Sequence, residues 1–103
     1  MAEKNLLLGS LNDVYGEFLS DKQRRIVSAY YDEDLSLAEI AENENITRQA
    51  VLDLIKRASA KLNGLEKKYG YLDKFLSLKA LSEKVKSGDK TALRKMLDII
   101  DDI

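Results

Sequence analysis

Residues 35–62, LSLAEIAENENITRQAVLDLIKRASAKL, are the stretch that decides how this chain folds. Ile40 and Ala41 place an apolar and a small residue side by side, which allows a second helix to cross closely over the first. Asn45 follows Ala41 by four positions, where glycine is usual, and asparagine also tolerates the left-handed backbone of a tight turn. This half of the stretch is therefore typical of a first helix followed by a tight turn.

The second half of the stretch begins with residues suited to closing that turn. Ile46 is an apolar plug for the corner, and Thr47 is a suitable cap for a helix that starts at Arg48. Val51 and Leu54 then return this helix to the core. The whole stretch predicts a helix-turn-helix, and a plain helical hairpin is the alternative interpretation.

Helices are also expected on both sides of this unit, because the 103-residue chain has no proline and only five glycines. Ser20 with Gln23, and Ser36 with Glu39, have the spacing of capping boxes, which open helices. The apolar spacing predicts helices over about 4–18, 21–31, 36–43, 48–69, 71–86 and from 87 or 89 onward. We therefore expect an all-α fold of five or six helices.

The chain length predicts a single domain, 1–103, built from two parts. A sigma-like helix-turn-helix subdomain covers about 5–69, and a C-terminal helical hairpin covers about 71–103. Apolar residues recur at helical spacing in both parts. In the first helix these residues are Leu7, Leu11, Val14 and Phe18. The apolar stripes of the hairpin allow it to pack back on the long helix or to form a homodimer, which would bury the same patch on both copies.

The composition excludes several kinds of chemistry. Histidine and cysteine are absent, which excludes the commonest general base, a zinc site and a cysteine nucleophile. The sequence has no glycine-rich phosphate loop and no metal-ligand spacing, so we expect no enzyme activity, no catalytic residues, no metal and no cofactor. No apolar run reaches the roughly 20 residues that span a bilayer, and no signal peptide is recognisable. We therefore expect a cytoplasmic protein with no membrane insertion.

The charges are distributed unevenly along the chain. The net charge is −1, so binding to nucleic acid requires a local basic patch. Acidic residues dominate 32–44. Basic residues lie at Lys22, Arg24, Arg25, Lys56, Arg57, Lys61, Lys67, Lys68 and Lys74. This separation indicates either an ordinary solvated surface or a strip that contacts the phosphates of an RNA helix, which needs shape and charge but little base reading.

The start of the second helix of a helix-turn-helix points into the major groove of DNA. Thr47, Arg48 and Gln49 occupy this start, and arginine and glutamine can read guanine and adenine edges. Asp53 on the same face repels phosphate, and Leu52 offers no hydrogen bond, so the face is poor in groups that read DNA. A solvated first turn is an equal alternative for Arg48 and Gln49. The candidate nucleic-acid-binding residues are Thr47, Arg48, Gln49, Lys56, Arg57 and Lys61.

The sequence is similar to two known families. Residues 21–62 resemble the promoter-reading region of bacterial sigma factors, where a helix-turn-helix ends in a motif similar to Thr47-Arg48-Gln49 followed by Val51. A closer resemblance, over 15–75, is to the YlxM family. The matching segments are Leu19-Ser20-Asp21-Lys22-Gln23, Tyr30-Tyr31, Ser36-Leu37-Ala38-Glu39-Ile40-Ala41, Arg48-Gln49-Ala50-Val51, Ile55-Lys56-Arg57 and Leu65-Glu66-Lys67-Lys68. Glu44-Asn45-Ile46 replaces the aromatic-Gly-Val turn of that family.

The YlxM resemblance implies a function in the signal recognition particle pathway. Proteins of this family are described as regulators, and their genes commonly neighbour that of the particle's GTPase protein. The resemblance thus implies a regulatory accessory protein that contacts the particle's RNA, its GTPase protein, or both. The alternatives are a DNA-binding transcriptional regulator that uses Arg48 and Gln49, and a protein-interaction module that uses the hairpin and Leu52.

Overall fold

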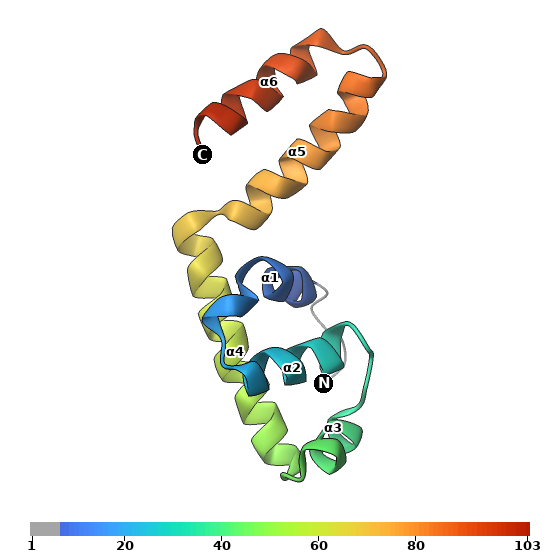
Figure 1. Ribbon diagram of the computed structural model, residues 1–103, viewed down its shortest axis with the longest axis vertical. Coiled ribbons are helices and arrows are strands. Elements are labelled where there is room, and N and C mark those ends of the chain that lie inside the picture. Colours follow the sequence, from blue (N-terminus) through green and yellow to red (C-terminus); the bar gives the residue numbers. More distant parts are fainter. Residues whose placement is uncertain (1–6) are drawn as a thin grey trace. The chain divides into compact units, whose positions relative to one another are not determined.

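The computed structural model describes residues 7–103, which form α-helices, one 3-10 turn and no strand (Figure 1). The elements of this part of the chain are α1 (Leu7–Tyr15), η1 (Gly16–Phe18), α2 (Asp21–Tyr31), α3 (Leu37–Glu44), α4 (Arg48–Tyr69), α5 (Tyr71–Lys86) and α6 (Lys90–Asp101). The prediction of an all-α fold with a C-terminal pair of helices is confirmed. The predicted starts at about residues 4 and 5 lie outside the described residues.

Both predicted capping boxes are present. The Ser20 hydroxyl accepts a hydrogen bond from the Gln23 backbone N–H, and the Gln23 side chain accepts one from the Ser20 N–H, both at 3.1 Å. Ser36 and Glu39 make the same reciprocal pair, also at 3.1 Å. These bonds satisfy backbone donors that the first turn of a helix leaves without partners, so α2 and α3 begin where the sequence predicts.

The turn between α3 and α4 has the predicted backbone. Asn45 adopts the left-handed conformation, with φ of 57° and ψ of 45°. The Ile46 N–H then donates to the Ala41 carbonyl at 3.0 Å, which closes the end of α3. The Thr47 hydroxyl accepts a hydrogen bond from the Ala50 N–H at 3.0 Å and so caps α4. The structure therefore contains the turn of a helix-turn-helix.

The described chain divides into two compact units at Tyr69 and Gly70. Gly70 has a φ of 65°, a conformation that favours glycine, and it separates the last residue of α4 from the first residue of α5. Gly64 lies within α4, which runs on to Tyr69.

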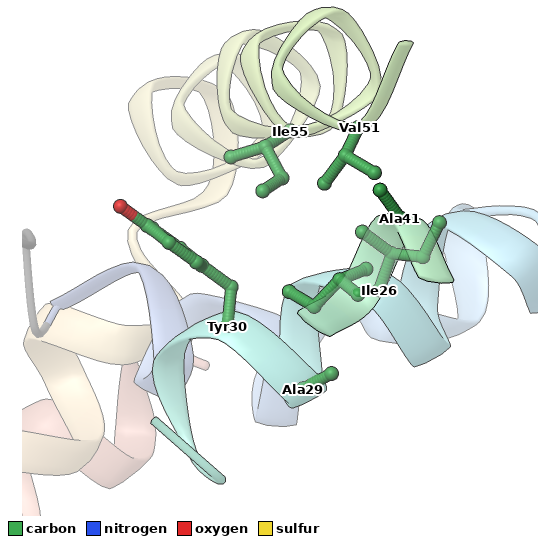
Figure 2. Packing of buried hydrophobic residues seen from close by; sticks show 7 residues of the cluster. Ile26, Ala29, Tyr30, Ala41, Val51 and Ile55 are labelled. Atoms are coloured by element: carbon green, nitrogen blue, oxygen red, sulfur yellow. The ribbon is translucent and has the colours of Figure 1, made fainter. Parts of the chain in front are cut away.

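The core of the first unit lies where α2, α3 and α4 meet. Figure 2 shows Val51 and Ile55 of α4 directed toward Ile26 and Tyr30 of α2, with Ala41 of α3 beside them. All five residues are buried. The small Ala41 side chain lets α3 and α4 approach closely, as the sequence predicts.

Helix α1 packs against α2 and α4, but its buried face differs from the stripe read in the sequence. Leu8, Leu11 and Tyr15 are buried, whereas Leu7 and Phe18 are each 56% exposed. The stripe through Leu7 and Phe18 fails because Leu7 is at the first helical turn and Phe18 lies in the 3-10 turn, where the α-helical phase no longer applies.

Tyr15 ties α1 to the far end of α4. Its ring is 2% exposed, and its hydroxyl donates a hydrogen bond to Glu66 Oε1 at 2.7 Å, between residues 51 positions apart. A buried tyrosine hydroxyl usually finds such a partner, because leaving it without one is costly.

In the second unit, α5 and α6 form an antiparallel hairpin (Figure 1). Gly88, with a φ of 93°, ends the connection, and the Asp89 carboxylate caps α6 by accepting from the Ala92 N–H at 3.0 Å. At the open end of the hairpin, Lys74 Nζ lies 3.7 Å from Asp102 Oδ2. Large apolar side chains of this unit that remain exposed are Tyr71, Phe75, Leu76, Leu93, Leu97, Ile100 and Ile103.

The substitution Ala41→Leu tests the close crossing of α3 over α4. We expect a loss of about 1–3 kcal/mol in the free energy of unfolding, because added methyl groups overpack a buried site. Ala38→Leu on the exposed side of the same helix is the control and should change stability by less than about 0.5 kcal/mol. Equal effects in urea unfolding would contradict the importance of this crossing.

Candidate nucleic-acid interface

The face that would read DNA begins with residues that already have partners within the protein. Thr47 Oγ1 accepts the Ala50 N–H, so this hydroxyl serves as the cap of α4. Gln49 Nε2 donates to Asp53 Oδ1 at 2.9 Å, one helical turn further on. The amide that could read an adenine edge is therefore held against a carboxylate of its own helix, which lowers its availability for a base.

Arg48 is exposed, but its surroundings are acidic rather than basic. It lines an open groove of about 360 Å³ whose other lining residues are Tyr30, Asp34, Ser36, Leu37, Ala38 and Glu39. Two carboxylates share this groove with the guanidinium. Their negative potential opposes the approach of a phosphate to Arg48.

Basic residues gather on a different side of α4. At about 100° per residue, Arg57, Lys61 and Lys68 lie within roughly 40° of one another around the helix axis. All three are exposed. Lys56 is turned by about 100° from Arg57, so it belongs to the neighbouring side of the helix. The six candidate residues thus lie on different sides of α4 and not in one patch.

The structure adds a residue from α2 to this basic side. A cleft of about 500 Å³ is lined by Ser20, Lys22, Gln23, Ile46, Ala50, Asp53, Leu54 and Arg57. Lys22 and Arg57 are distant in sequence but line the same cleft. We name Lys22, Arg57, Lys61 and Lys68 the basic strip. Lys22 was not among the candidate residues from sequence, because nothing local in the chain shows that the start of α2 lies beside α4.

One arginine that the sequence placed in the basic cluster is already paired with a carboxylate of the same chain. Arg25 Nε and Nη2 donate to the two carboxylate oxygens of Glu44 at 2.8 and 2.7 Å, in a bidentate pair that joins α2 to α3. The hydrogen bond from Arg25 lowers the pKa of Glu44 below its ordinary 4.5, and the same bond raises the pKa of Arg25. Arg25 therefore stabilises the helix arrangement and adds little to a nucleic-acid surface.

Residues 7–103 contain no group of three or more acidic side chains placed to hold a metal ion. None of the helices in this range is both long and apolar enough to cross a membrane.

The capped turn at Asn45, the close crossing at Ala41 and the exposed start of α4 define a helix-turn-helix protein. The sequence comparison agrees: residues 2–102 match a family model described as "UPF0122: Putative helix-turn-helix protein, YlxM / p13 like". The chain belongs to this family.

Curated relatives come from several bacteria, and each is described only as a UPF0122 protein. The chain is 52% identical over 65 residues to one from Desulforamulus reducens, covering 63% of this chain and 56% of the relative. It is 40% identical over 99 residues to one from Clostridium botulinum, covering 88% and 91%. It is 41% identical over 98 residues to one from Halalkalibacterium halodurans, covering 94% and 90%. The first of these matches spans less than two thirds of the relative's length, whereas the other two span nearly all of it.

The Arg25–Glu44 pair predicts a pH dependence of stability. Because the folded-state pKa of Glu44 is lowered, its contribution is present above the unfolded pKa of 4.5 and is lost as the pH falls through the folded value. Glu44→Gln should therefore destabilise the protein near neutral pH and differ little from the parent at about pH 3. Urea unfolding at both pH values measures this, with Glu42→Gln, an exposed neighbour on α3, as control. A Glu44→Gln effect that is the same at both pH values would contradict the assignment.

The Gln49–Asp53 bond predicts that Asp53 opposes DNA binding. Asp53→Ala removes a negative charge and releases the Gln49 amide, so affinity for random duplex DNA should rise by about 1 kcal/mol, or roughly fivefold. Glu42→Ala makes the same charge change away from this face and should have a smaller effect. Fluorescence anisotropy titrations at low salt give both affinities, and an unchanged affinity for Asp53→Ala would show that this carboxylate does not limit binding.

Proposed function

We propose that this protein is a regulatory accessory of the bacterial signal recognition particle and binds the particle's RNA, with or without its GTPase protein. The pathway comes from the YlxM resemblance. The RNA contact is supported by the basic strip, whose exposed cations come from α2 and α4 and of which Lys22 and Arg57 line one cleft. The proposal assigns binding and no catalytic step.

Phosphate contacts suit the basic strip better than base reading does. The strip presents lysines and one arginine, and the ion pairs of the described residues involve other cations, namely Arg25, Lys74 and Lys86. Contacts of this kind recognise the shape and charge of an RNA backbone and need no base edge. The face expected to read bases instead holds the Gln49–Asp53 bond.

A second candidate function is DNA-binding transcriptional regulation. It is favoured by the complete helix-turn-helix and by the exposure of Arg48 at the start of α4. A guanidinium at this position can donate two hydrogen bonds to the edge of one guanine. The acidic groove around Arg48 argues against it, because Asp34 and Glu39 line the same groove and repel DNA phosphates.

A binding titration at two salt concentrations separates the two functions. It compares the particle's RNA, alone and with the GTPase protein, against random duplex DNA. We expect tighter binding to the RNA than to DNA, with an affinity that falls as salt rises. Preferential binding to DNA would favour the transcriptional function, and binding to neither nucleic acid would overturn the RNA contact.

Charge reversal then locates the contact. Arg57→Glu with Lys61→Glu should weaken RNA binding and lower the slope of log affinity against log salt by about 1 for each lost phosphate contact. Lys79→Glu with Lys84→Glu makes the same charge change on exposed lysines of α5 and is the control. Arg48→Ala with Gln49→Ala should leave RNA binding nearly unchanged. If this last pair removes binding and the first pair does not, the interface is the reading face and not the basic strip.

A further inference from the structure

Helix α6 has an apolar stripe that α5, its partner in the hairpin, leaves exposed. Leu93, Leu97 and Ile100 are 44%, 51% and 48% exposed, and at about 100° per residue they lie within roughly 60° of one another. Ala92 is buried, on the side of α6 that faces α5. The steps of four and three residues along this stripe are those by which one helix packs along another.

Helix α5 adds an aromatic side chain on the same side of the hairpin. Helical phase turns Phe75 away from Ser77 and Ala80 on α5, and turns Leu93 and Ile100 away from Lys95 and Asp98 on α6. The cleft of about 480 Å³ between the two helices, lined by Ser77, Ala80, Leu81, Lys95, Asp98 and Ile99, opens on the opposite side. Leu93, Leu97, Ile100 and Phe75 therefore form one apolar face of the second unit.

The charges of α6 are arranged in an unusual order along its axis. Lys90, Arg94 and Lys95 lie in the first half, whereas Asp98, Asp101 and Asp102 lie at the end. The helix dipole favours the reverse order, with acids at the N-terminus and bases at the C-terminus. Asp89, the N-cap of α6, is an acidic residue that does follow that preference.

The charges of α5 do not offset the basic start of α6. The end of α5 that adjoins the start of α6 also has Lys84 and Lys86, so one end of the hairpin gathers five bases against Glu83 and Asp89. At the opposite end of the hairpin, Lys74 of α5 pairs with Asp102, with 3.7 Å between Nζ and Oδ2. The connected end of the hairpin is thus basic, and the C-terminal end of α6 is acidic. The apolar face lies between these two ends.

We infer that this face binds a second copy of the same chain, through antiparallel packing of α6 against α6 of the partner around a two-fold axis. In that arrangement the apolar stripes meet each other, and the basic half of each helix faces the acidic half of the other. A centre between Leu97 and Asp98 brings Arg94 of each copy opposite Asp101 of the other. The surface is self-complementary, because apolar side chains meet apolar side chains and opposite charges face each other, as a two-fold interface requires.

The exposed apolar surface is enough for a small two-fold interface. Four half-exposed side chains of roughly 200 Å² each present on the order of 400 Å² of apolar surface per copy. With the flanking charged residues, the total approaches the roughly 600–800 Å² per partner of small specific interfaces. The dimer should therefore be reversible, with a Kd on the order of micromolar.

Sedimentation equilibrium of the full chain, from about 1 to 500 μM, tests the inference. We expect a monomer–dimer equilibrium that Leu97→Glu shifts to monomer by at least tenfold in Kd. Leu76→Glu is the matched control, because Leu76 is 47% exposed and lies on the side of α5 turned away from α6. Far-UV circular dichroism verifies that both variants keep their helices. A monomer at all concentrations, or equal Kd values for the two variants, would overturn the inference.

A charge exchange gives a test that does not depend on deleting apolar surface. Arg94→Asp alone and Asp101→Arg alone should each weaken the dimer, since each places like charges opposite one another across the two-fold axis. The double variant restores opposite charges and should recover most of the parent Kd. Failure of the double variant to recover the dimer would exclude the antiparallel register. If Arg94→Asp weakens RNA binding and leaves the sedimentation unchanged, the basic end binds nucleic acid and the Arg94–Asp101 contact across the two-fold axis is excluded.

Discussion

The close crossing of α3 and α4 is the constraint on which the first unit depends. Ala41 is small enough for α4 to pass at short range, and Val51 occupies the space that this leaves. The chain can make the crossing because Asn45 adopts the left-handed conformation and reverses direction within a few residues. Helix α2 then covers both helices with Ile26 and Tyr30 (Figure 2). The position of every exposed side chain on α4 follows from this arrangement.

The same arrangement decides which polar side chains pair within the protein and which remain available to a partner. Arg25 and Glu44 join α2 to α3, and Gln49 and Asp53 bind each other along α4. Because of these pairs, Arg25 and Gln49 are less available to bind a nucleic acid. Among the cations that remain, Lys22 of α2 and Arg57 of α4 line one cleft. A fold shared with DNA readers can therefore present a surface better suited to phosphates than to bases.

Much of the fold could be predicted because its determinants are local. A capping box is complete within four residues, and Asn45 needs only its own backbone, so Ser20, Ser36 and Asn45 could be interpreted from the sequence alone. The face of α1 could not, since the choice between Leu7 and Leu8 depends on contacts with α2 and α4. The YlxM resemblance extended the prediction to the family, which the match over residues 2–102 confirms.

The candidate site was less predictable, because pairing between distant residues decides it. Nothing near Arg25 in the sequence shows that Glu44, 19 residues later, binds it. Likewise, Lys22 approaches Arg57 only after α2 has packed on α4. Sequence spacing identified the cations, whereas the structure decided which of them already have partners. The roles of Thr47, Arg48, Gln49, Lys56, Arg57 and Lys61 in binding stay predictions.

The bond between Tyr15 and Glu66 has a consequence for the order of events during synthesis. The two residues are 51 positions apart, so the ribosome adds Glu66 well after Tyr15. At about 5–20 residues per second, the interval is on the order of several seconds. Isolated helices as short as α1 are marginal in water, so this segment waits without its partner until α4 has been made. Helix α1 is thus translated well before α4 and completes its packing only when α4 is available.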